Sequence, residues 1–131
     1  GGRVRAVVRL GRKRFEQLVA DALRQIPPEF QRALDNVEVV IEAWPTAEQL
    51  ADAGLDPDEL LFGLYQGTPL PQRSPLEPYR LPDVITIFQG PLEEACATED
   101  EMREEIRKTV VHELAHYFGF DEERLEELGL G

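Results

Sequence analysis

Two histidines and a glutamate near the C-terminal end have the residue types and the spacing of a metal site. The chain contains only two histidines, His112 and His116, and they lie four residues apart. On a helix this spacing places both imidazoles on one face, where they can bind the same ion. Glu113 is displaced by about 100° around such a helix, so it can serve as the general base for a metal-bound water rather than as a ligand. Because zinc commonly takes imidazole and carboxylate ligands, the pattern predicts a zinc site suited to hydrolysis.

A catalytic zinc needs a third protein ligand, and the sequence offers acidic residues shortly after His116. Gly119 follows the predicted site helix and can take the left-handed conformation that turns the chain back towards the ion. Asp121, Glu122 and Glu123 then supply three carboxylates. The same acids also suit the cap and the first turn of a following helix. The two roles are compatible if one acid caps that helix and another binds the ion.

The elements that must hold these residues follow from hydrophobic periodicity and capping signals. The site helix is predicted over Thr98–Phe118, with a capping box formed by Thr98 and Glu101. The other predicted elements are strands at 3–10, 37–43, 60–66 and 84–88, helices at 15–26, 46–53 and 121–128, and a long proline-rich loop at 67–82. One mixed sheet with helices packed on it, an α+β fold, is the simplest architecture for this order.

Composition and charge narrow the classes of partner. The chain has 131 residues, of which 42% are hydrophobic and 31% charged, which is typical of one globular domain. Its formal net charge of −12 is expected to repel nucleic acid and anionic membranes, although residues 1–14 form a basic arm that could contact phosphates. The sequence has no apolar run of membrane-spanning length and no signal-peptide pattern. The only cysteine, Cys96, is expected to be buried, and we expect a cytoplasmic protein with no membrane or nucleic-acid partner. The excess of arginine over lysine, with ten prolines, favours a heat-tolerant source.

Several stretches together resemble a known family. They are Thr109–Leu128 around the two histidines, Leu61–Leu70, Leu81–Phe88, and the first predicted helix with the Pro27–Phe30 segment that follows it. This chain is similar to the minimal zincin-like metallopeptidases, which are small single-domain bacterial proteins with the pattern His-Glu-x-x-His-x-x-Gly-x-x-Asp. The last position of that pattern is 122. The resemblance implies a zincin-like domain over residues 15–131, in which a small mixed sheet packs on the active-site helix and one or two further helices. It also implies zinc as the cofactor and Glu122 as the third ligand, with Asp121 as the alternative.

The expected reaction is hydrolysis of a peptide bond by a zinc-activated water, with Glu113 as the general base and a peptide or protein as the substrate. Candidates for contacts to the oxyanion or the substrate are Tyr65, Arg73 and Tyr117, together with Tyr79 and Arg80. Tyr117 can instead pack in the core. The alternative function is a catalytically inactive zincin scaffold that binds a partner. The small size of the chain favours this alternative, whereas the presence of Glu113 argues against it.

Overall fold

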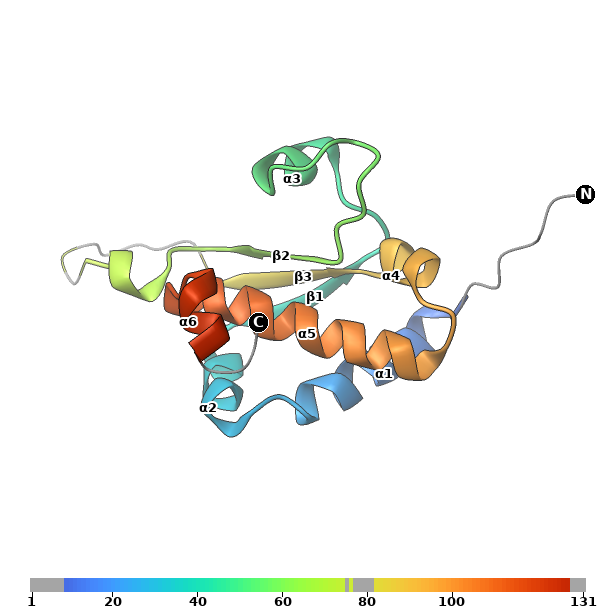
Figure 1. Ribbon diagram of the computed structural model, residues 1–131, viewed down its shortest axis with the longest axis horizontal. Helices are drawn as coiled ribbons and strands as arrows, with labels where there is room; N and C mark the ends of the chain where they lie inside the picture. The colour runs from blue at the N-terminus through green and yellow to red at the C-terminus, as the bar shows by residue number, and fades with distance from the viewer. Residues whose placement is uncertain (1–8, 75, 77–81, 128–131) are drawn as a thin grey trace, which may run out of the picture.

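The computed structural model describes residues 9–74, 76 and 82–127 and has the expected α+β architecture (Figure 1). One small sheet packs against a long helix, α5, and α1 runs alongside α5. The elements in chain order are α1 (Arg12–Arg24), α2 (Pro28–Gln31), η1 (Arg32–Asn36), β1 (Glu38–Glu42), α3 (Ala47–Asp52), β2 (Gly63–Gln66), η2 (Leu70–Gln72), β3 (Val84–Phe88), α4 (Gln89–Ala95), α5 (Glu99–Phe118) and α6 (Glu122–Glu127).

The sheet has the strand order β1-β3-β2. β1 pairs with β3 in parallel, and β2 pairs with β3 in antiparallel orientation with Gly63 opposite Ile87. The central strand β3 is rich in β-branched residues, and its residues Ile85 to Phe88 are all buried. β2 lies at the edge of the sheet and also packs against α5. One side of β2 therefore pairs with β3, and its other side is open to side chains from α5.

Local signals in the sequence set both ends of α5. The Thr98 hydroxyl accepts the main-chain N–H of Glu101 at 3.1 Å, as an N-cap does. The Glu101 carboxylate accepts the N–H of Ala97 at 2.6 Å, one residue before the position that the predicted capping box requires. At the other end Gly119 has φ 77° and closes the helix in the left-handed conformation, as predicted.

The hydrophobic core lies between α1, the sheet and one face of α5. Fully buried residues of α1 meet those of β3 and a stripe along α5. The stripe repeats every four residues, which keeps it on one helix face, and consists of Met102, Ile106, Val110 and Leu114. The core thus fixes the rotation of α5 about its axis. This rotation directs the opposite side of the helix, which carries the histidines, away from the core.

Most predicted elements are present with small shifts of their ends, and some were not predicted. The strand predicted at 3–10 falls mainly on residues 1–8, which lie outside the described part. Leu10, its last residue, is not in a strand, because its N–H donates to Glu93 and its C=O accepts from Gln89. The short helices α2, η1 and α4 were not predicted, and η2 interrupts the predicted loop at 67–82. Within the described residues, no helix is both long enough and apolar enough to cross a membrane.

Candidate metal centre

The last three turns of α5 bring the two histidines together. The Nε2 atoms of His112 and His116 lie 3.3 Å apart, and the ring centroids 5.0 Å apart. Two nitrogens that each lie about 2.1 Å from a tetrahedral zinc are separated by about 3.4 Å, so the observed pair fits such an ion. Glu113 completes a group whose ligand atoms all lie within 4.8 Å of one another. Two imidazoles suit a zinc ion, and the carboxylate of Glu113 lies beside them, where a general base is expected rather than a ligand.

Glu113 is held differently from the histidines, because it is buried with an exposed fraction of 8%. Its Oε1 accepts the main-chain N–H of Tyr65 at 2.8 Å. Burial raises the pKa of the Glu113 carboxyl, although the Tyr65 N–H and the positive charge that His116 and His112 can carry oppose the rise. A carboxylate with a raised pKa is a stronger base, which suits the role predicted for this residue.

The close approach of β2 to α5 depends on Gly63. A Cβ at this position would lie 2.5 Å from Cγ2 of Thr109 and 3.2 Å from the main-chain oxygen of Thr86. Any larger residue would therefore push the strand and the helix apart. Glycine at position 63 lets the strand come near enough for the Tyr65 N–H to reach Glu113.

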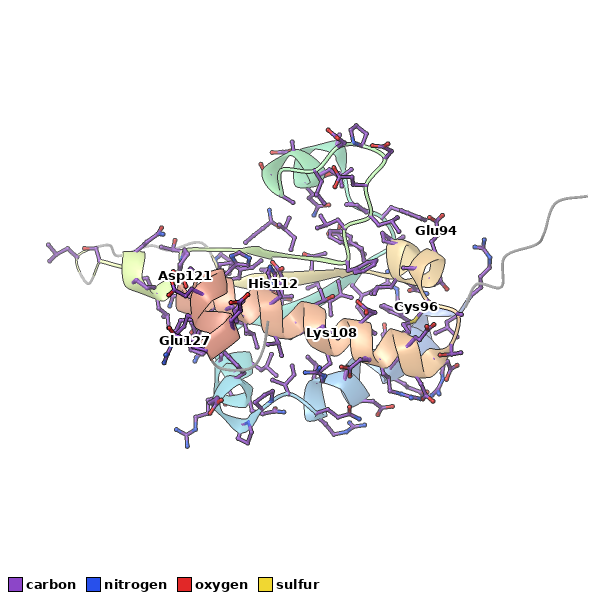
Figure 2. The ribbon with its side chains drawn as sticks, viewed as in Figure 1. Glu94, Cys96, Lys108, His112, Asp121 and Glu127 are labelled. Carbon is purple, nitrogen blue, oxygen red and sulfur yellow. The ribbon has the colours of Figure 1, made fainter. Side chains whose placement is uncertain are left out.

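A cleft of about 910 Å³ opens beside the three residues. Its walls come from the C-terminal end of α3 and the residues after it, from β2 and the segment before it, and from α5 between Arg107 and His116. Apolar side chains of Leu61, Phe62 and Leu64 line it next to the polar groups of His112, Glu113 and His116. Figure 2 shows His112 on the side of α5 that faces β2. The candidate metal ligands therefore face a space that is large enough for part of an extended peptide.

The turn after α5 carries the predicted third ligand. Asp121 precedes α6, and its Oδ1 accepts the N–H of Arg124 at 2.8 Å, which is the contact of an N-cap. Figure 2 places Asp121 beyond His112, towards the end of α5 where α6 begins. Glu122 is the first residue of α6, and its side chain lies outside the described part of the structure.

Comparison with known protein families agrees with this geometry. A family profile described as zincin-like metallopeptidase matches residues 34–131, which include the sheet, the histidines and the acidic turn. The chain belongs to this family. Membership confirms the resemblance seen in the sequence and the zincin-like fold, and it implies a metal ion, usually zinc, and a peptide as the class of substrate. A comparison with curated proteins gives no significant match.

Three further residues of this zincin-like chain were predicted to contact the oxyanion or the substrate, and the structure gathers them into one cluster. The Tyr65 hydroxyl donates to Oδ1 of Asp83 at 2.6 Å, and Arg73 forms an ion pair with the same carboxylate. The Arg73 guanidinium lies 5.3 Å from the ring centroid of Tyr117, which is buried with an exposed fraction of 4%. Burial and the contact with Asp83 raise the pKa of the Tyr65 hydroxyl, which keeps it protonated as a donor. The Tyr65 hydroxyl and the Arg73 guanidinium are thus both engaged with Asp83. Tyr79 and Arg80 lie outside the described residues.

Two participants in the site were not identified from the sequence. The main-chain N–H of Tyr65 carries no sequence signal, because every residue except proline has this group. Asp83 lies between Pro82 and the buried strand β3, and nothing in its immediate neighbours in the sequence identifies its partners. An acid in that position, near a loop that contains arginines, is the signal that could have found it.

Proposed function

We propose that the chain hydrolyses peptide bonds, with a zinc ion held by His112, His116 and Glu122. The observation that supports this most is the 3.3 Å separation of the two imidazole Nε2 atoms at the wall of a cleft, with a buried carboxylate beside them. Glu122 is proposed as the third ligand because the family pattern places its acid at position 122. The cap formed by Asp121 supports this choice, since it gives the alternative acid a separate role.

In this proposal Glu113 moves the proton. When bound, zinc would supply Lewis-acid polarisation of the scissile carbonyl and would lower the pKa of water. Glu113 would take a proton from the attacking water and deliver it to the amine that leaves. The N–H of Tyr65 would orient the carboxylate through Oε1, leaving the second carboxylate oxygen to accept that proton. Apolar side chains of the cleft would exclude bulk water from the reacting groups.

The substrate is proposed to be an extended peptide that lies along the free edge of β2. Main-chain groups on that side of an edge strand can hydrogen-bond an added strand. Gly63 and Tyr65 belong to the same alternating set in β2, and both line the cleft next to Glu113. Because the Tyr65 N–H donates to Glu113, the peptide would bond to the main-chain groups of Gly63 and to the C=O of Tyr65. An extended main chain in this position would pass close to the two imidazoles.

The test is hydrolysis of a library of unstructured peptides by the zinc-loaded protein and by the Glu113→Gln variant. Glutamine is nearly isosteric with glutamate but cannot accept the proton from water. We expect the variant to retain zinc and to lose activity by about 100-fold or more. Arg14→Gln, which alters a surface ion pair away from the cleft, is the control and should retain full activity. A zinc-loaded parent that cleaves no peptide of the library would contradict the proposal and favour a partner-binding scaffold.

A further inference from the structure

A charged cluster joins β2, the segment after it and the start of β3. Oδ1 of Asp83 accepts the Tyr65 hydroxyl at 2.6 Å, and Oδ2 forms the ion pair with Arg73. Nε of Arg73 donates to the main-chain oxygen of Thr68 at 2.9 Å. The side chains of the ion pair are only 15% and 10% exposed, for Arg73 and Asp83 respectively. The cluster therefore fixes the Tyr65 side chain from one side by groups that are largely shielded from water.

The same cluster touches α5 one turn after Glu113. The ring of Tyr65 meets the ring of Tyr117 edge to face, with centroids 6.1 Å apart. The guanidinium of Arg73 also lies over the Tyr117 ring, 5.3 Å from the ring centroid. Gly67 also matters, because a Cβ there would collide with Oδ1 of Asp83. The Tyr65 ring is thus held between Asp83 and α5.

We propose that Asp83 and Arg73 are positioning residues for Glu113. They fix the side chain of Tyr65, and thereby the register and direction of its main-chain N–H, which donates to Glu113 at 2.8 Å. Within the described residues, the route from the ion pair to Glu113 runs through Tyr65, and a second contact with α5 is the one between Arg73 and the ring of Tyr117. The link to catalysis rests on the proposed function, in which Glu113 is the general base, whereas the link to the Tyr65 N–H does not.

A purely stabilising role predicts a different pattern of effects. If the cluster only stabilised the fold, its loss would accelerate exchange at the amides that open by global unfolding, which include those in the core of α5. If it positions Tyr65, its loss must act first on the Tyr65 N–H and on the residue that accepts from it. Amide hydrogen exchange, measured residue by residue, separates these two cases and requires neither zinc nor a substrate.

The experiment compares amide exchange in the metal-free parent with exchange in Tyr65→Phe and Arg73→Gln. Tyr65→Phe removes only the hydroxyl that Asp83 accepts, so folding should be retained. We expect the Tyr65 amide to exchange about 10-fold faster in each variant, with Ile106 and Leu114 in the core of α5 unchanged. Arg14→Gln breaks an exposed ion pair between two other elements, Arg14–Glu99, and should leave the Tyr65 amide as in the parent. Unchanged exchange at Tyr65, or an equal acceleration at all amides, would overturn the proposal.

Kinetics provide the second readout, if the zinc-loaded parent is active. Loss of a positioning contact should lower kcat by about 10-fold with KM nearly unchanged. In a Glu113→Gln background the same substitutions should have no further effect on kcat, because the residue through which they act is gone. Arg73→Lys, which keeps the charge beside Asp83, should restore part of the loss. Independent, multiplicative losses of kcat in the double variants would contradict a route through Glu113. An inactive parent, together with faster exchange of the Tyr65 amide in the single variants, would contradict only the proposed function.

Discussion

The two halves of α5 carry their charges in opposite ways. In the N-terminal half, residues 99–108, charged side chains lie towards solvent and pair one turn apart, as Arg107 does with Glu104. In the C-terminal half, residues 109–118, the only carboxylate is Glu113, which is buried and accepts a main-chain N–H from another element. The apolar face of the helix continues through both halves without a break.

This difference separates the part of the helix that holds the fold from the part that can do chemistry. Exposed pairs at helical spacing contribute little to stability, so the first half tolerates exchange of its charges. A buried carboxylate is costly, and the hydrogen bond from the main-chain N–H of Tyr65 offsets part of that cost. Such a group is typical of sites where a base with a raised pKa is needed.

The largest effect is expected in zinc affinity, at the site that the C-terminal half of α5 forms with the turn after it. Glu122→Ala should weaken zinc binding by more than about 100-fold, because it leaves two protein ligands. Asp121→Ala should retain zinc and cost about 1 kcal/mol of unfolding free energy through the lost cap. Arg107→Gln, in the N-terminal half, is the control and should change neither quantity measurably. Competition with a chromophoric chelator gives the affinities, and denaturant unfolding gives the stabilities. If Asp121→Ala lost the zinc while Glu122→Ala kept it, the two roles would have to be exchanged.

A smaller effect is expected where β2 meets the C-terminal half of α5. Gly63→Ala places a methyl group against Thr109, and overpacking of this kind costs about 2 kcal/mol of unfolding free energy. Thr109→Ser removes the methyl group in the way, so the double variant should recover more than half of the loss. Thermal and denaturant unfolding of the four proteins measure this coupling. Full stability of Gly63→Ala alone would show that β2 and α5 have room to adjust. The close approach of β2 to α5 would then not depend on glycine at position 63.

The effect farthest from the candidate site concerns Cys96, which precedes the N-terminal half of α5. The thiol is 2% exposed, and burial, with smaller contributions from Glu105 and Glu101, raises its pKa to about 11. The thiolate fraction at pH 8 should be about 100-fold lower than in the unfolded chain, because the pKa rises by about two units. We expect iodoacetamide to react at least that much more slowly with the native protein than in denaturant. Equal rates would mean that this end of the helix opens readily.

The sequence predicts the fold well where local patterns and tertiary packing agree. α1, β1, β3 and α5 each have a clear hydrophobic period, and the structure contains all four. The short helices α2 and α4 were missed because no residue with a capping side chain precedes either of them, and α4 follows β3 without a turn residue between them. Their positions depend on packing rather than on periodicity.

In the candidate site, too, some contacts could be predicted from the sequence and others could not. His112, Glu113 and His116 follow from spacing on one helix, so their proximity could be predicted from the sequence. The contact of the Tyr65 N–H with Glu113 and the contact of Asp83 with Arg73 could not be predicted. Both depend on how β2 lies beside β3. Contacts between residues distant in sequence depend on this pairing, which no local pattern encodes.

The metal content of the protein, purified without chelators, tests the central claim most directly. Elemental analysis of the parent and of His116→Ala gives the number of zinc ions per chain, with circular dichroism as a check that the variant is folded. The account predicts one zinc per chain in the parent and none in His116→Ala, because the imidazoles of His112 and His116 are separated by a distance that one tetrahedral ion spans. Equal zinc content in the two proteins, or a parent that binds no zinc even when zinc is supplied in excess, would contradict a metal centre on α5.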